Sequence, residues 1–109
     1  PPASGFDVGR CIERLDSELP MLGVTKGCMI DMNAYRKNMV SVLALMEALP
    51  QQAGIEVISF EPYLCEGGLC KTNIDGTFIY RDGGHLSHEG SVFMANKMSL
   101  MEKIRLAAK

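Results

Sequence analysis

The spacing of apolar residues first predicts a helix near the start of the chain. Phe6–Leu19 carries apolar residues at helical intervals, Asp7 is placed to cap the first turn, and Pro20 ends the pattern. Glycines interrupt any period in Met21–Ile30, so we expect a loop there, tied down by Cys28.

A second, longer helix is predicted to begin at Asn33 (or Asp31) as its cap and to run to about Leu49. Pro50 and Gly54 follow and are expected to close it. Its Met-rich apolar stripe is typical of a core-facing helix. The stripe consists of Tyr35, Met39, Val42, Leu43, Met46 and Leu49.

A short β-branched run, Ile55–Phe60, follows this helix. A helix leading into such a run is the second half of a βαβ unit, whose strand usually lies in a parallel sheet covered on both faces. The sequence contains no second strand of that kind upstream. We therefore expect an α/β fold whose sheet is completed either by residues N-terminal to this sequence or by another chain, and we favour the first.

Residues typical of turns and helix caps predict a β-hairpin and a final helix in the rest of the chain. Asp75-Gly76 between Lys71–Ile74 and Thr77–Tyr80 is a typical two-residue hairpin signal. Ser87 occupies the N-cap position of a final amphipathic helix. The apolar residues of that helix are Val92, Phe93, Met94, Leu100, Met101 and Ile104.

Composition narrows the classes of function. The 109 residues carry a formal net charge of −2 spread along the chain, which argues against nucleic-acid or anionic-membrane binding. No apolar run approaches the roughly 20 residues that span a bilayer. The chain opens Pro1-Pro2-Ala3-Ser4-Gly5, without an initiator Met or a signal peptide, so we expect a piece of a longer protein.

The four cysteines, Cys11, Cys28, Cys65 and Cys70, lack the spacing of a zinc site or a C-x-x-C redox motif. One near pair and one mid-range pair indicate two local disulfides, Cys11–Cys28 and Cys65–Cys70, and hence an oxidising compartment. Four buried free thiols in a cytosolic protein are the alternative.

Candidate chemistry concentrates in Tyr80–Gly90, where Asp82 precedes His85 by three residues on a glycine turn. A carboxylate beside an imidazole accepts its N–H, fixes its tautomer and stabilises the imidazolium formed when the ring takes a proton. Gly83 and Gly84 allow the tight turn that brings both side chains to one pocket. An Asp in a loop can also simply cap a turn through its own backbone, so the spacing alone leaves a structural role open.

The neighbouring polar residues have simpler explanations. His88 follows His85 by three residues, but this spacing does not supply the usual three ligands of a catalytic zinc, and we expect His88 to face solvent in the first helical turn. Ser87 is explained as a helix cap rather than a nucleophile. Glu89 is explained by the helix dipole.

The combination of Cys65 to Cys70, the Asp75-Gly76 hairpin and Tyr80-Arg81-Asp82 followed by His85-Leu86-Ser87-His88-Glu89-Gly90 resembles the last block of the SGNH hydrolases. More narrowly, it resembles the SGNH domain fused to acyltransferase-three type membrane proteins of bacteria, which O-acetylate surface polysaccharides such as lipopolysaccharide O-antigen. The family pattern there is two cysteines, a glycine-turn hairpin and Tyr-x-Asp-x-x-His-Leu-Ser-x-x-Gly. The resemblance is close over residues 63–95 and looser before residue 55.

The resemblance implies a three-layer α/β/α (flavodoxin-like) domain with a parallel sheet, a small β-hairpin and a serine-esterase site. By matching position, Asp82 orients the ring and His85 is the general base for a serine. The family's Gly-Asp-Ser, oxyanion Gly and Gly-x-x-Asn blocks precede this region, and none occurs here. Ser4 lacks a preceding strand and is a poor nucleophile candidate. Residues 1–109 are thus expected to be the C-terminal part of a single SGNH-like domain, inactive alone.

Two classes of function follow. The first is part of an O-acyltransferase or esterase that moves an acetyl or short acyl group to or from sugar hydroxyls, with Asp82 and His85 as catalytic residues and without a cofactor or metal. Its partners would be an acyl donor, a polysaccharide acceptor and the parent chain's membrane domain, on the periplasmic side of the bacterial inner membrane. The second is a disulfide-stapled α/β module that binds glycans or proteins without catalysis.

Overall fold

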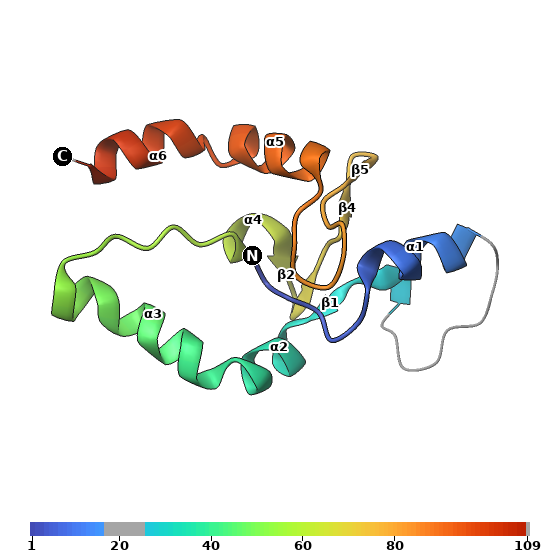
Figure 1. Ribbon diagram of the computed structural model, residues 1–109, viewed down its shortest axis with the longest axis horizontal. Helices are drawn as coiled ribbons and strands as arrows, with labels where there is room; N and C mark the ends of the chain where they lie inside the picture. The colour runs from blue at the N-terminus through green and yellow to red at the C-terminus, as the bar shows by residue number, and fades with distance from the viewer. Residues whose placement is uncertain (17–25, 109) are drawn as a thin grey trace.

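The computed structural model describes residues 1–16 and 26–108 and shows a mixed α/β chain (Figure 1). Two helical arms extend from a small body that contains the strands, and the whole measures 50 × 29 × 21 Å. The helices are α1 (Val8–Asp16), a 3₁₀ turn η1 (Lys26–Cys28), α2 (Met32–Asn38), α3 (Val40–Ala53), α4 (Glu61–Leu64), α5 (His88–Lys97) and α6 (Leu100–Ala107). The strands are β1 (Ile30–Asp31), β2 (Cys65–Glu66), β3 (Leu69–Cys70), β4 (Asn73–Ile74) and β5 (Thr77–Phe78).

The strands form two small antiparallel sheets. One has the order β1-β3-β2, with Ile30 opposite Cys70 and Cys65 also opposite Cys70. The other is the β4-β5 hairpin, with Asn73 opposite Phe78. Asp75 (φ 51°) and Gly76 (φ 80°) both take the left-handed conformation that a tight hairpin turn requires, which confirms the predicted turn.

Both predicted disulfides are present. Cys11–Cys28 joins α1 to η1, and Cys65–Cys70 closes the β2-β3 turn. The buried hydroxyl of Thr72 donates to the Cys28 carbonyl at 3.0 Å, so the first disulfide is also tied to the chain that leads into the second hairpin. A large part of the packing of the body thus depends on covalent links and on a compact core of Val8, Ile30, Met32, Leu64, Cys70, Ile79, Tyr80, Met94 and Met98.

The first predicted helix is confirmed in part. Helix α1 covers Val8–Asp16, and the Asp7 carboxylate accepts the Arg10 N–H at 3.0 Å, as expected of its cap. The predicted end at Pro20 and the first half of the predicted Met21–Ile30 loop lie outside the described residues, and the second half contains η1 and the start of β1.

The predicted second helix is divided into α2 and α3, and one of its two predicted caps is present. Asp31, rather than Asn33, is the N-cap of α2, and Met39 has a non-helical backbone (φ −115°, ψ 22°) between α2 and α3. Helix α3 continues through Pro50 and ends at Gly54, whose φ of 63° is favourable for glycine. Pro50 lies inside the helix on an exposed turn, where it has no backbone N–H to donate to the carbonyl four residues earlier.

The prediction that the α3 stripe lies in the core is wrong for this structure, because α3 has no buried residue. The predicted strand at Ile55–Phe60 is also wrong, since that segment is irregular chain and pairs with no strand of the described residues. Both errors have one cause. A buried strand and a buried helix face need neighbours, and α3 and α6 lie apart on either side of this segment (Figure 1). The parallel sheet and three-layer arrangement stay predictions.

The predicted final helix is likewise broken in two. Ser99 adopts a left-handed conformation (φ 49°, ψ 47°), which separates α5 from α6 and leaves Met98 buried. The α6 arm contacts α4 through Lys103, whose Nζ lies 5.7 Å from the centre of the Tyr63 ring. Within the described residues no helix is long and apolar enough to cross a membrane.

Candidate active site

The loop that carries Asp82 and His85 is closed by its own backbone. Tyr80 pairs with Leu86 in an isolated antiparallel bridge, and the Arg81 N–H donates to the His85 carbonyl at 2.9 Å. The loop therefore begins and ends at one point, directly after β5 and directly before α5. This geometry fixes the spacing of the two side chains that the sequence singles out.

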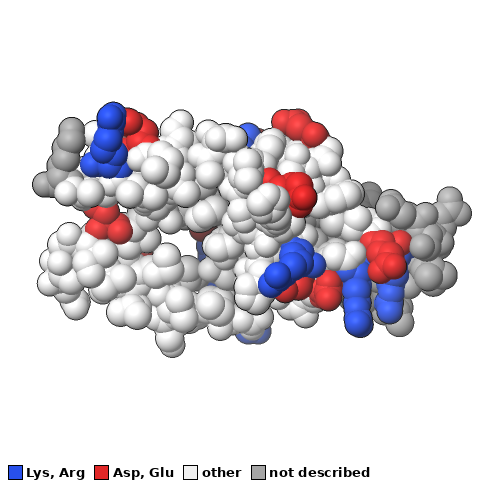
Figure 2. All heavy atoms as spheres, turned by 45° about the horizontal axis from the view of Figure 1, so that its top comes forward, with Lys and Arg blue, Asp and Glu red and all other residues white. Residues whose placement is uncertain are grey.

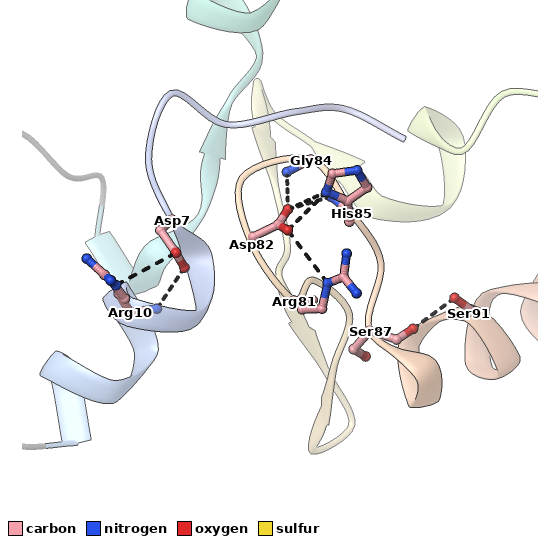
Figure 3. Close-up of polar contacts among 8 residues, drawn as sticks. All are labelled: Asp7, Arg10, Arg81, Asp82, Gly84, His85, Ser87 and Ser91. Atoms are coloured by element: carbon pink, nitrogen blue, oxygen red, sulfur yellow. Dashed lines mark hydrogen bonds and ion pairs between the residues drawn. The ribbon is translucent and has the colours of Figure 1, made fainter.

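The structure brings Asp82 and His85 into contact (Figure 3). Nδ1 of His85 lies 2.9 Å from both Oδ1 and Oδ2 of Asp82. With Nδ1–H donated to the carboxylate, Nε2 is the ring nitrogen left free to accept a proton. The His85 side chain is 72% exposed, so the ring is oriented by its partner and still reachable from outside.

Asp82 also organises the turn itself. Its Oδ1 accepts the backbone N–H groups of Gly84 at 3.0 Å and His85 at 2.9 Å. These two bonds, followed by the hydrogen bond and charge of the His85 ring, lower the pKa of Asp82 from 3.8 to about 2. The carboxylate is therefore ionised throughout the neutral range and serves both the turn and the imidazole.

The N-terminal segment is hydrogen-bonded to the loop. The Ser4 N–H donates to the Gly83 carbonyl at 2.7 Å, and the buried Tyr80 hydroxyl donates to the Pro2 carbonyl at 2.7 Å. Burial, with a smaller contribution from Tyr35, raises the pKa of Tyr80, so its hydroxyl remains a donor. No sequence pattern predicts these contacts, because they join residues nearly eighty positions apart.

Helix α1 packs against the loop at a glycine. A Cβ on Gly9 would lie 2.7 Å from the Arg81 carbonyl oxygen, so only glycine allows this approach. The loop is thus held by α1 on one flank and by the segment before it on the other.

Ser87 is a helix cap, as predicted. Its Oγ accepts the Gly90 N–H at 2.8 Å and donates to the Phe78 carbonyl at 2.6 Å. The Ser87 N–H donates to the Ile79 carbonyl at 2.9 Å, which fixes the start of α5 against the end of the hairpin. His88 is exposed in the first turn of α5, as expected.

Ser4 has a structural environment. Its Oγ donates to the carbonyls of Phe6 and, at 3.2 Å, Gly83. In the part of the chain that the structure describes, no serine hydroxyl hydrogen-bonds to His85, and no group of three His, Cys, Asp or Glu side chains could hold a metal ion. The site thus offers an oriented base without a nucleophile among these residues.

Charge does not accumulate on the face drawn in Figure 2. Acidic and basic side chains lie beside one another in small groups, and much of the surface of the two helical arms is uncharged. The chain as a whole carries a formal net charge of −2.

Comparison with known proteins identifies a family. Residues 1–99 match the family model described as SGNH domain (fused to AT3 domains). No curated protein and no solved structure gives a significant match. The match includes α1, both sheets, the Asp82–His85 loop and all of α5.

Proposed function

The chain belongs to the SGNH domain family, a class of esterase- and acyltransferase-like hydrolase domains, and we propose that it supplies the Asp and His of a Ser-His-Asp acyl-transfer site. The observation that carries the proposal is the pair of 2.9 Å contacts from His85 Nδ1 to Asp82, which leave Nε2 free on an exposed ring. That is the arrangement a general base requires.

In the proposed mechanism, His85 Nε2 takes the proton of a serine hydroxyl as that oxygen attacks an acyl carbonyl. The imidazolium, stabilised by the ionised Asp82, then protonates the leaving group. An acyl-enzyme forms and is resolved by a sugar hydroxyl in transfer or by water in hydrolysis. We propose that the serine and the donors to the oxyanion lie outside this sequence, in the rest of one SGNH-like domain whose C-terminal part is residues 1–109.

The proposed setting is the periplasmic side of the bacterial inner membrane, as a domain of a membrane protein. The fusion of this family's domain to AT3 domains supports a membrane partner domain. The two disulfides support an oxidising compartment. The proposed reaction is transfer of an acetyl or short acyl group to or from a hydroxyl of a surface polysaccharide, such as O-antigen.

The test is His85→Ala in the full-length protein, with His88→Ala as the matched control. His88 is also exposed and lies three residues away, so its loss removes an imidazole without touching Asp82. Acyl transfer should fall by about 10²–10⁴-fold in His85→Ala and stay near wild type in His88→Ala. Equal activity of the two variants would remove His85 from the mechanism and favour the non-catalytic binding module.

A further inference from the structure

Arg81, between the buried Tyr80 and the site carboxylate, has a firmly placed backbone. Its N–H donates to the His85 carbonyl at 2.9 Å. Its carbonyl oxygen lies against Gly9 of α1, where even a methyl group would come within 2.7 Å. The root of the Arg81 side chain is therefore fixed relative to the His85 ring.

The guanidinium of Arg81, by contrast, makes one long ion pair and no hydrogen bond. Its side chain is 67% exposed, and Nε lies 3.6 Å from Asp82 Oδ2, beyond hydrogen-bond distance. Asp82 is already satisfied by the backbone N–H groups of Gly84 and His85 and by the His85 ring. Within residues 1–16 and 26–108, the guanidinium donates no hydrogen bond.

Arg36 and Arg105 show the contrast. Arg36 hydrogen-bonds the Glu61 carboxylate. Arg105 donates to Glu102 Oε2 at 2.6 Å. Both cations thus donate a hydrogen bond to a carboxylate of the chain, whereas Arg81 has only the 3.6 Å ion pair of its Nε with Asp82, which leaves its two Nη groups available to a ligand.

Arg81 also lies close to the His85 ring, which carries the proposed base nitrogen. Asp82 Oδ2 contacts both partners, with His85 Nδ1 at 2.9 Å and Arg81 Nε at 3.6 Å. Figure 3 shows the Arg81 guanidinium and the His85 ring extending from the same loop next to that carboxylate. An anionic group bound by Arg81 would therefore lie close enough to His85 for one sugar to contact both residues.

We propose that Arg81 is a specificity residue that binds a carboxylate or phosphate on the acyl acceptor, so that the site selects acidic sugars. This inference rests on the proposed function. A guanidinium presents paired N–H donors that match both anions bidentately, and such charge-assisted bonds are about twice as strong as neutral ones. The acceptor hydroxyl would be one on the acidic sugar or on its neighbour.

The test compares ligand binding by the full-length protein, since binding does not depend on turnover. The probes are methyl glucuronoside, glucose 6-phosphate and methyl glucoside, measured by titration calorimetry. The variants are Arg81→Gln, Arg81→Lys and, as control, Arg105→Gln, whose parent side chain is similarly exposed at 70%. Wild type should bind at least one acidic probe about 10- to 100-fold more tightly than methyl glucoside.

Arg81→Gln should abolish that preference, Arg81→Lys should keep part of it, and Arg105→Gln should keep all of it. Which acidic probe wins distinguishes carboxylate from phosphate. Equal affinity of wild type for all three probes, or an undiminished preference in Arg81→Gln, would overturn the inference.

A kinetic split separates this role from support of Asp82. Arg81→Gln should raise KM for an acidic acceptor with kcat nearly unchanged, and an equal fall in kcat on acidic and neutral acceptors would overturn the inference. His85→Ala distinguishes the two proposals. It should abolish transfer while the acidic preference persists, and persistence of both would refute the proposed function alone.

Discussion

At Gly90, helix α5 packs closely against the backbone of Ile79, which follows β5. A Cβ at this position would lie 2.2 Å from the Ile79 carbonyl oxygen, 2.7 Å from its Cα and 2.8 Å from its carbonyl carbon. All three are backbone atoms, so no side-chain rotation relieves the overlap. Gly90→Ala must therefore push α5 away from Ile79.

The two opposing effects of Gly90→Ala differ in size. Alanine in place of glycine favours a helix by about 1 kcal/mol. Overpacking against backbone costs about 1–3 kcal/mol or more, and the displaced Ile79 carbonyl weakens its 2.9 Å bond from the Ser87 N–H, worth about 1 kcal/mol. With an overlap this deep, we expect a net loss of about 2 kcal/mol, or a fall in Tm of about 10 °C.

Gly84→Ala is the matched control, because its Cβ would meet only the Ala3 Cβ at an ordinary 3.8 Å. Urea unfolding followed by circular dichroism should place Gly84→Ala within about 0.5 kcal/mol of wild type and Gly90→Ala well below both. Equal midpoints for the two variants would refute the close packing of α5 on Ile79.

Two further predictions concern the loop that carries Asp82 and the start of α5. The pKa of Asp82 is lowered to about 2, so its stabilising effect is fully present above about pH 4 and is lost as the pH falls through 2. Urea titrations from pH 5 to 2 should therefore show a steeper loss of stability for wild type than for Asp82→Asn, and parallel curves would contradict this. Ser87→Ala should lower the free energy of unfolding by about 1 kcal/mol, because the Gly90 N–H loses its acceptor. Ser91→Ala, on an exposed turn, should change it by less than about 0.5 kcal/mol, and similar thermal melts of the two variants would argue against the cap.

Local chemistry made part of the structure predictable from sequence. The Asp7 and Ser87 caps, the Asp75-Gly76 turn and the contact between Asp82 and His85 each depend on residues within a few positions of one another. When two interacting residues are only a few positions apart in the sequence, few backbone conformations separate them, so their contact can be predicted. The disulfide pairs were predictable because four cysteines divide into one near pair, with a sequence separation of 5, and one mid-range pair, with a separation of 17.

The predictions that failed concern features that depend on residues far away in the sequence. Ile55–Phe60 has the composition of a buried strand, yet without a partner strand its backbone has no ladder to join. The breaks at Met39 and Ser99 carry no proline or glycine to announce them. The hydrogen bond from Tyr80 to Pro2 connects residues 78 positions apart, which no periodicity records.

We propose that the ring held by Asp82 activates a serine contributed by protein outside this sequence. Fluorophosphonates modify activated serines, so labelling of the full-length protein with such a reagent is the decisive experiment. We expect one labelled serine outside residues 1–109, found by mass spectrometry, with labelling lost in His85→Ala and retained in His88→Ala. Labelling of His85→Ala at the wild-type rate, or no labelled serine in the wild type, would contradict it.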